Sequence, residues 1–387
     1  SYPGELIMGF LNRLPARQDG YYSRNRMWKN KGSDSEANRR TLVSPSHMLV
    51  NIGGAGAHAY EVEAAVELDL NTAANWDDSQ YATAANRAGK DFYVYACVPV
   101  SGYVPVIILS AATTYPAGYT ADNSRKIGGF HCECVNVGTI SGHPLTGYLA
   151  GDIIPRSCWD LSHRSAGAQA GMVWAGKTDF DTLAGPNIWV GIYLASGTGA
   201  NTRSIFGGTI SDSRTWLDFV DDFAAIGCRM LDDDEFQRIA AGSNEKTNIA
   251  GSADPGTTGG HSDTAGRRMI SNIGCEDCCG VMWQWLRTQS YRFDGAAKHT
   301  HQVTVSGDPE TVTSGNPSGD VAPAWTWYDL PGAKGSINKQ GTYGDVKLLG
   351  GGYCYSATSA GSRARDANRY RWATTSAFGG RFCAEPD

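Results

Sequence analysis

Residues 348–387 have the sequence LLGGGYCYSATSAGSRARDANRYRWATTSAFGGRFCAEPD, in which two glycine-rich runs with apolar edges enclose a polar interior. That interior is rich in Tyr, Ser, Thr, Ala, Asn, Asp and Arg and has almost no aliphatic side chains. Because such a segment can add little to a core, we expect it on the surface, held by its two ends. Rigid aromatic residues beside small hydrogen-bonding residues are typical of a paratope. A long polar surface loop with two glycine turns is the alternative interpretation.

The composition of the whole chain favours a globular, mainly β protein. Its 387 residues are too many for one small core, so two or three domains are expected. Hydrophobic residues make up 41% and charged residues 19%, which is a globular rather than a disordered balance. The 48 glycines and the few helical periodicities indicate turns and short strands.

Charge and hydropathy exclude several partners. The net charge is −6 and there is no basic run, which argues against nucleic acid as a partner. No apolar stretch approaches the length of a membrane span, and the first residues do not begin a signal peptide. We therefore expect neither membrane insertion nor secretory export.

The ten cysteines are expected to be buried thiols, because cytoplasmic synthesis leaves most of them reduced. Cys275 and Cys278 form a CxxC motif, but no second CxxC and no His pair at ligand spacing accompanies it. The motif is therefore weak evidence for a zinc site.

Local patterns predict the elements of the first half. Residues 1–45 are polar and suggest a docking arm or a frayed tail. Short strands are predicted within 48–70, and a short helix within 71–89. The runs 91–98 and 104–109 are predicted to pair around a Ser-Gly turn, followed by a strand at 126–131. A domain boundary is placed near Ile154.

The second half combines aromatic strands with two helices. Apolar spacing predicts helices at 215–226 and 232–241, the second beginning with an acidic turn that suits the helix dipole. Strands are predicted at 171–176, 188–194 and 281–286, and long loops at 243–270 and 306–345. The expected core tryptophans are Trp174, Trp189, Trp216, Trp283 and Trp285.

Several motifs occur together in the order found in one known family. The segments GCRMLDDDEFQRIAAG (227–242), CCGVMWQW (278–285), GGGYCY (350–355) and FGGRFC (378–383) resemble the C-type lectin fold in its formylglycine-generating-enzyme branch. More narrowly, they resemble the major tropism determinant (Mtd) family, the phage variable proteins of diversity-generating retroelements. Further similar segments are RAGKDFYVYAC (87–97), GYTADNSRKIGGFH (118–131), CWDLSHR (158–164) and GIYLASG (191–197).

The resemblance covers about residues 87–387 and implies a fold. It implies a mainly β protein with a C-terminal α+β C-type lectin-fold domain, long loops and few helices. The implied division is an N-terminal virion-attachment and oligomerisation region at 1–85, an intermediate β domain at 86–154, and a lectin-like domain at 155–387. The variable region lies at about 350–383. For the first 80 or so residues no resemblance is found, and their fold stays open.

The resemblance also implies which residues bind a receptor. A retroelement rewrites adenine-bearing codons, typically of Asn, and their products are the residue types found in this segment. Residues 353, 355, 357 and 359 are expected to alternate on a strand and so to face one way. The whole expected receptor-binding set is Tyr353, Tyr355, Ala357, Ser359, Asp366, Asn368, Arg369, Arg371 and Thr375. A near-copy of the DNA for 350–383 is then expected beside a reverse transcriptase gene.

The implied function is that of a receptor-binding protein at the tip of a phage tail fibre, which determines host tropism. It would bind a host cell-surface protein or glycan through the variable surface, and a tail fibre or other virion protein through its N-terminal region. A homotrimer in the virion is implied, since avidity multiplies a modest affinity. No catalytic activity, cofactor or metal is expected.

Three other functions stay open. One is a cellular variable display protein of the same retroelement class. The second is a copper-dependent oxidase of the formylglycine-generating type, for which only Cys354 and Cys383 are available and lie far apart in sequence. The third is a calcium-dependent lectin using the acidic run 232–235, which helix capping and the helix dipole explain better. The remaining candidates for chemistry are His131, His163, His261 and the pair His299 and His301.

Overall fold

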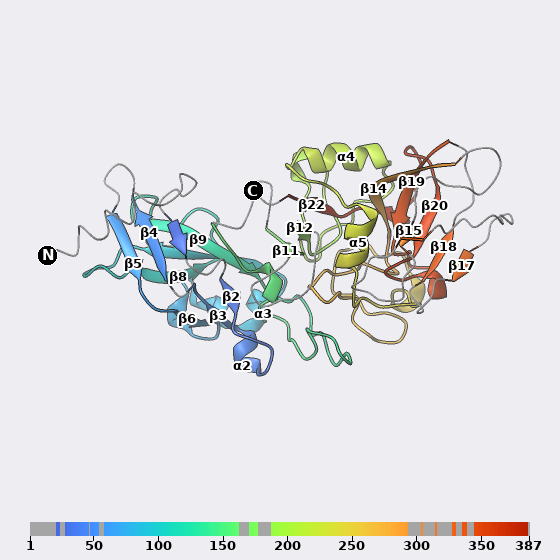
Figure 1. Ribbon diagram of the computed structural model, residues 1–387. Helices are drawn as coiled ribbons and strands as arrows, with labels where there is room; N and C mark the ends of the chain where they lie inside the picture. Colours follow the sequence, from blue (N-terminus) through green and yellow to red (C-terminus); the bar gives the residue numbers. More distant parts are fainter. Residues whose placement is uncertain are drawn as a thin grey trace.

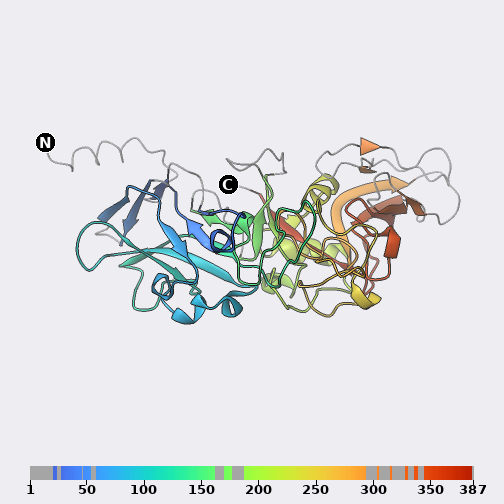
Figure 2. The same cartoon turned by 90° about the horizontal axis from the view of Figure 1, so that it is seen from below.

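The computed structural model describes residues 21–23, 28–45, 47–53, 58–161, 170–176, 187–292, 303–304, 314–315, 327–329, 335–338 and 344–385. Figure 1 shows two lobes side by side, which we call the N-terminal lobe (described residues up to 161) and the C-terminal lobe (described residues from 170). The view from below keeps this end-to-end arrangement (Figure 2). Among the described residues, no helix combines the length and apolar character needed to cross a bilayer.

The N-terminal lobe consists of short antiparallel strands. Its sheets have the orders β1-β4-β5, β2-β3-β6 and β10-β9-β7-β8. The strands are β1 (Tyr21–Ser23), β2 (Lys29–Asn30), β3 (Thr41–Val43), β4 (Met48–Ile52), β5 (His58–Val62), β6 (Glu67–Asp69), β7 (Asp91–Cys97), β8 (Val106–Ser110), β9 (Ser124–His131) and β10 (Trp159–Asp160). Its helices are α2 (Glu36–Arg39) and α3 (Ala84–Arg87), with 3-10 turns η1 (Ala73–Asn75), η2 (Ser79–Ala82) and η3 (Pro155–Ser157).

One apolar core draws on all three sheets of this lobe. Trp28, Trp76, Phe92 and Phe130 belong to a single buried cluster, and the rings of Trp76 and Phe92 meet edge to face at 4.9 Å. The cluster draws on residues from 28 to 158, so the described residues on the two sides of position 85 share a core. The three-part division of the chain stays a prediction.

The expectation of a polar arm at 1–45 is wrong for residues 28–45. Trp28 is 0% exposed, and a Cβ on Gly128 of β9 would lie 2.5 Å from its ring. Because the segment is mostly polar, its composition did not reveal that Trp28 packs against a glycine of a strand distant in the sequence. The predicted pairing of 91–98 with 104–109 is confirmed by the β7–β8 ladder, in which Val94 lies opposite Leu109.

The C-terminal lobe holds two sheets of four and six strands, with orders β11-β12-β22-β13 and β17-β18-β20-β19-β14-β21, and a separate β15-β16 pair. The strands are β11 (Met172–Trp174), β12 (Trp189–Gly191), β13 (Arg229–Met230), β14 (Trp283–Arg292), β15 (Val303–Thr304), β16 (Ser314–Gly315), β17 (Trp327–Asp329), β18 (Ser336–Asn338), β19 (Gly344–Gly350), β20 (Arg365–Arg369), β21 (Phe378–Gly379) and β22 (Phe382–Ala384). Its helices are α4 (Trp216–Ala224) and α5 (Asp233–Ile239), with 3-10 turns η4 (Gly199–Asn201), η5 (Ala250–Ser252) and η7 (Ala357–Ser359).

Both predicted helices of this lobe are confirmed, and local capping explains where they begin. Thr215 caps α4, accepting from the Asp218 backbone N–H at 3.1 Å while Asp218 accepts from the Thr215 N–H at 2.8 Å. At α5 the carboxylate of Glu235 accepts from the Asp232 N–H at 2.8 Å. The acidic run 232–235 therefore serves helix capping, as one of the two interpretations predicted.

The loop predicted at 306–345 is only partly a loop. The described pieces of this stretch include β16, β17, β18 and the first residues of β19. Strand β18 pairs in parallel with β20, with Ile337 opposite Arg365. A partner so far along the chain leaves no local pattern, which is why the sequence did not reveal these strands.

The two lobes are joined by apolar contacts. Tyr93 and Tyr95 of β7 and Trp159 of β10 share a buried cluster with residues of the C-terminal lobe such as Trp189 and Phe382. The rings of Tyr93 and Trp159 meet edge to face at 6.4 Å. This shared cluster holds the C-terminal lobe against the N-terminal lobe.

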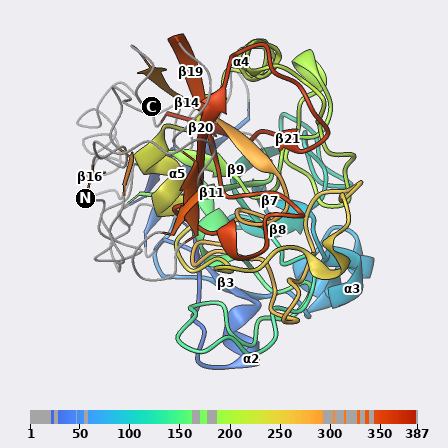
Figure 3. The ribbon, with the colours of Figure 1, turned by 90° about the vertical axis from the view of Figure 1, so that its right-hand side faces the viewer.

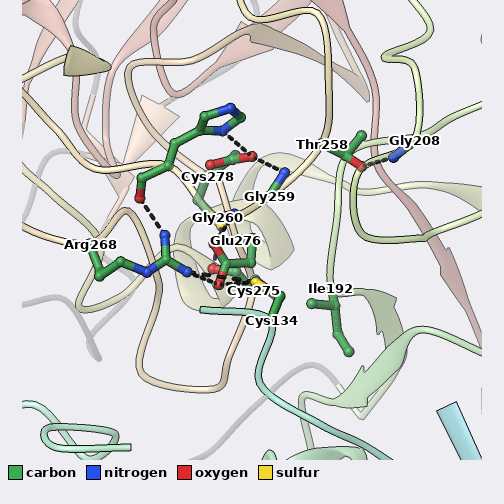
Figure 4. Close-up of polar contacts among 12 residues, drawn as sticks. Cys134, Ile192, Gly208, Thr258, Gly259, Gly260, Arg268, Cys275, Glu276 and Cys278 are labelled. Carbon is green, nitrogen blue, oxygen red and sulfur yellow. Dashed lines mark hydrogen bonds and ion pairs between the residues drawn. The ribbon is translucent and has the colours of Figure 1, made fainter. Parts of the chain in front are cut away.

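A buried polar cluster joins the lobes as well (Figure 4). Arg268 donates to Glu276 at 2.6 Å, and the Gly260 N–H donates to the same carboxylate at 3.2 Å. From the N-terminal lobe, the thiol of Cys134 approaches Glu276 at 3.6 Å. Glu276 and its neighbour Asp277 are the two residues inside the CxxC motif, so the motif contributes carboxylates to this junction.

Glu133 lies in this junction, but no hydrogen-bond donor reaches its carboxylate. It is 0% exposed, and neither of its carboxylate oxygens has a hydrogen-bond partner. Burial raises the pKa of Glu133 well above its usual range, and repulsion from Glu276 raises it further. Because the folded chain holds this proton more tightly than the unfolded chain, the free energy of unfolding falls as pH rises from about 4.3 towards the raised pKa.

We predict that Glu133→Gln removes this loss. Each unit by which the folded-state pKa is raised corresponds to about 1.4 kcal/mol, so the variant should gain on the parent as pH rises from 5 to 8. Melting temperatures across that range measure the effect, with the exposed Glu63→Gln as control. The same pH dependence of the melting temperature in Glu133→Gln and in the parent would contradict the account.

Candidate functional site

Seven of the nine predicted receptor-binding residues lie on two segments at the outer end of the C-terminal lobe, and the other two, Asp366 and Asn368, lie on β20. We call residues 353–359 the first display segment and residues 369–376 the second display segment. The first follows β19 and the second begins at the last residue of β20. Figure 3 faces this end of the molecule and shows β14, β19, β20 and β21 with α4 beside them.

The first display segment is attached to the scaffold through its backbone. Tyr353 forms a bridge with Val281, and the side-chain amide of Asn248 donates to the Cys354 carbonyl. Just beyond the segment, the Lys246 N–H donates to the Ala360 carbonyl at 2.9 Å. None of these hydrogen bonds uses a side chain of the display segment.

The strand expected for 353–359 is wrong. The Ser356 N–H donates to the Tyr353 carbonyl at 2.9 Å, and the Tyr353 N–H donates to the Ser356 hydroxyl at 2.8 Å, which closes a turn. Residues 357–359 then form the 3-10 turn η7, with Ala357 at a φ of 46°. The backbone groups are satisfied locally, so no strand partner is needed.

Exposure differs along the first display segment. Tyr355 is 61% exposed and Ala357 is also exposed, whereas Tyr353 and Ser359 are half-buried. The rings of Tyr353 and Tyr355 meet edge to face at 5.7 Å. Tyr353 also packs on two buried apolar clusters. Tyr355 thus projects outward from a ring that is itself fixed.

The predicted residues on β20 behave differently. Asp366 and Asn368 are 2% and 4% exposed, so their side chains do not form an open surface in the described chain. Arg369 is half-buried; its guanidinium donates to Asp366 at 3.3 Å and lies over the Phe378 ring. Burial raises the pKa of Asp366 to about 6, although Arg369 opposes the shift. A role of these three residues in receptor binding stays a prediction.

The second display segment lies along the start of α4. The Trp216 N–H donates to the Arg371 carbonyl at 2.9 Å, and the Ser213 N–H donates to the Thr375 carbonyl at 3.2 Å. The side chains of Arg371 and Thr375 are half-buried. As in the first segment, backbone hydrogen bonds hold the chain in place.

Sequence reasoning missed the most exposed aromatic pair of this segment. Tyr370 and Trp372 stack at 4.7 Å between ring centroids with an angle of 21° between their planes, and Trp372 is 60% exposed. A signal was present, since a tryptophan in a polar stretch without other large apolar residues has no local core to enter.

Both display segments pack against one buried cluster, and we call three of its aromatic rings the aromatic floor: Trp283, Trp285 and Phe378. Trp285 meets Phe378 edge to face at 5.1 Å. Tyr353 of the first segment and Ala373 of the second both pack against the cluster that contains the floor. The two segments therefore share a rigid support.

The predicted tryptophan core is confirmed. Trp189, Trp283 and Trp285 are at most 3% exposed, and Trp174 and Trp216 are partly buried against the same cluster. The prediction that the cysteines are buried is also confirmed, and all ten are free thiols.

The two cysteines considered for copper chemistry, Cys354 and Cys383, are buried. Burial raises the pKa of Cys354 to about 11 and also raises the pKa of Cys383, which disfavours the thiolate that a copper site needs. Among the described residues, no group of three or more His, Cys, Asp or Glu is arranged to hold a metal ion.

The histidines fall into two groups. His131 is 1% exposed and hydrogen-bonds the Tyr193 hydroxyl at 2.9 Å, and His261 pairs with Asp277 at 3.0 Å. Both imidazoles have hydrogen-bonding partners, and the His131–Tyr193 contact joins the two lobes. His163, His299 and His301 lie outside the described residues.

The chain is a mainly β protein with a C-type lectin-like fold. The α+β C-terminal lobe carries the two display segments, and the N-terminal lobe is rich in β-strands. Comparison with known proteins narrows this class. Residues 36–160 match the family model described as Mtd second domain. The chain is 24% identical over 278 residues to the tail fiber receptor-binding protein of Bordetella phage BPP-1, covering 67% of this chain and 69% of that protein.

Solved structures give the same answer for the fold. The I1 and M1 variants of the Major Tropism Determinant match with TM-scores of 0.64 and 0.61 at 20% identity, and each match covers 96% of this chain. The matches cover 88% and 85% of those structures. The chain is therefore Mtd-like, and the likeness includes residues before 87, where the sequence alone revealed no resemblance.

We predict that Gly351→Ala disrupts the first display segment. Gly351 has a φ of 93°, and a Cβ there would lie 2.3 Å from the Cys278 carbonyl oxygen. The strained backbone alone costs roughly 1–3 kcal/mol, so the melting temperature should fall by several degrees. Gly256→Ala is the matched control, because its Cβ meets nothing within 4 Å. Equal stability of the two variants would show that the glycine turn does not hold the segment.

Proposed function

We propose that this chain is the receptor-binding, tropism-determining protein of a phage tail fibre, and that it binds a host cell-surface receptor through the two display segments. The observation that carries the proposal is that the exposed side chains of the display segments are not the groups that hold the segments in place. Tyr355 and Trp372 are about 60% exposed, yet each ring lies against a second aromatic ring. Exposed rings held in fixed positions are what a binding surface needs.

The attachment of the segments supports a surface that tolerates exchange. The hydrogen bonds that position them join backbone carbonyls of Cys354, Arg371 and Thr375 to the scaffold. Replacing an outward side chain leaves these bonds intact, so the fold is retained while the specificity changes. This is the physical requirement for diversification by a retroelement.

The name of the Bordetella phage relative describes a tail fibre protein that binds a receptor, and we extend that role to this chain. We further propose a homotrimer located at the fibre tip, with the N-terminal region attached to another virion protein. Multiple copies would convert a modest affinity at each shallow surface into firm adsorption.

The rival functions have less support. A copper-dependent oxidase needs accessible thiolates, and Cys354 and Cys383 are at most 1% exposed. A calcium-dependent lectin needs a ligand set, and the acidic run 232–235 is engaged in helix capping and ion pairs. The tail fibre relative favours a phage protein over a cellular display protein.

We predict that Tyr355→Ala lowers adsorption of the phage to its host bacterium by about tenfold or more, the size of a hot-spot loss. Its melting temperature should stay near that of the parent, because the side chain is largely exposed. Tyr353→Ala should in addition lower the melting temperature, since that ring packs on the core. Tyr115→Ala, an exposed aromatic of the N-terminal lobe, is the control. Unchanged adsorption by Tyr355→Ala would overturn the proposed surface.

A further inference from the structure

The loop that carries the CxxC motif holds two thiols close together. Cys275 and Cys278 are both 0% exposed, and both are drawn in Figure 4. The Cys278 thiol turns back along the loop and donates to the Cys275 carbonyl at 3.8 Å. The two thiols also share a side-chain hydrogen bond. Both are free thiols, so the structure shows the reduced form of the loop.

The backbone of the loop keeps the two thiols near each other. Asp277 lies between the cysteines with a φ of 58°, which turns the chain at this point. The Glu276 N–H donates to the Ile192 carbonyl at 2.7 Å, and the Asp277 N–H donates to the Met269 carbonyl at 2.8 Å. These hydrogen bonds to neighbouring segments fix the turn, so the approach of the thiols is built into the folded chain.

The surroundings make Cys278 the reactive member of the pair. Burial disfavours its thiolate, but the hydrogen bond from Cys275 and the positive charge of Arg381 outweigh burial and lower the pKa of Cys278. Burial and the same hydrogen bond raise the pKa of Cys275, which therefore keeps its proton. The pKa values of the other eight cysteines are raised as well. Because the thiolate is the nucleophile, Cys278 should react before any other cysteine.

We propose that Cys275 and Cys278 form an oxidation site, at which a small hydroperoxide such as hydrogen peroxide converts the two thiols into a disulfide. The Cys278 thiolate attacks one peroxide oxygen and breaks the O–O bond, which leaves a sulfenic acid on Cys278 and releases hydroxide. The Cys275 sulfur then attacks the Cys278 sulfur to form the S–S bond, and the sulfenic hydroxyl leaves as water with the Cys275 proton. The two sulfurs thus give up two electrons, and the peroxide is reduced to water and hydroxide.

Burial selects the kind of oxidant. An oxidant reaches these side chains only through brief openings of the chain, and hydrogen peroxide is hardly larger than water. The adjacent Cys279 is also 0% exposed, but burial and the negative charge of Glu245 raise its pKa, so it should stay reduced. In the pair, the hydrogen-bonded Cys275 is already in place to capture a sulfenic acid on Cys278 before further oxidation.

A disulfide in this loop would stabilise the support of the first display segment. The Gly280 N–H donates to the Gly351 carbonyl at 3.2 Å, and a Cβ on Gly351 would lie 2.3 Å from the Cys278 carbonyl oxygen. The loop therefore packs directly under the start of that segment. A cross-link restricts the unfolded chain more than the folded one, so the oxidised protein should melt at a higher temperature than the reduced protein.

The test treats the purified full-length protein with hydrogen peroxide under native conditions, removes the peroxide with catalase, and alkylates the protein in denaturant. The tryptic peptide 269–287 contains Cys275, Cys278 and Cys279. We expect this peptide to carry one alkyl group after peroxide treatment and three in the reduced protein. The melting temperature should rise by several degrees and return to its starting value with a thiol reductant, which does not reverse methionine oxidation.

Serine variants identify the bonded pair. Cys275→Ser and Cys278→Ser should each abolish the disulfide, and Cys279→Ser is the matched control that should keep it. If a variant does not fold, fragmentation of the parent peptide still decides, because cleavage between positions 278 and 279 separates the peptide only when the ring closes at Cys278. A fully alkylated parent peptide, a disulfide that includes Cys279, or a sulfonic acid on Cys278 beside a free Cys275 would each overturn the inference. The measurement uses no host cell, so its outcome is independent of the proposed function.

Discussion

The buried guanidinium of Arg381 joins the segments on which the C-terminal lobe depends. It donates to the carbonyls of Gly191 and Ile192, each at 2.6 Å, to the Glu276 carbonyl, and to the Gln284 side chain at 3.1 Å. The side chain is 1% exposed, and a buried charge is tolerated only when its hydrogen bonds are made. Because these partners come from β12, β14 and the CxxC loop, Arg381 sets their relative positions.

The closing residues of the chain extend this constraint to the display surface. A Cβ on Gly380 would lie 2.8 Å from the Phe219 ring, so the chain passes α4 in close contact. Residue Phe378 then lies beside Trp283 in the parallel β14–β21 pair and completes the aromatic floor. The scaffold is thereby fixed on both sides of the second display segment, and the exposed side chains can differ without moving it.

Local features of this fold could be predicted from the sequence, and non-local ones could not. The helices at α4 and α5 carry their apolar spacing and caps in adjacent residues, and the β7–β8 pair surrounds a short turn. By contrast, the burial of Trp28 depends on Gly128, about a hundred positions away, and the β18–β20 pairing joins segments with no shared local pattern. The candidate site divides in the same way: the resemblance pointed to Tyr355, and the polar surroundings of Trp372 could have indicated its exposure, whereas its stacking on Tyr370 required the structure.

The central claim is that the scaffold keeps its shape while the display side chains are replaced. The most direct test is a crystal structure of a variant in which the exposed residues Tyr355, Ala357 and Trp372 are changed together to polar residues. We expect the backbone of both display segments and the hydrogen bonds from Asn248 and Trp216 to be retained. Rearranged segments, or loss of the Trp283–Phe378 pairing, would contradict a support that is independent of the side chains it displays.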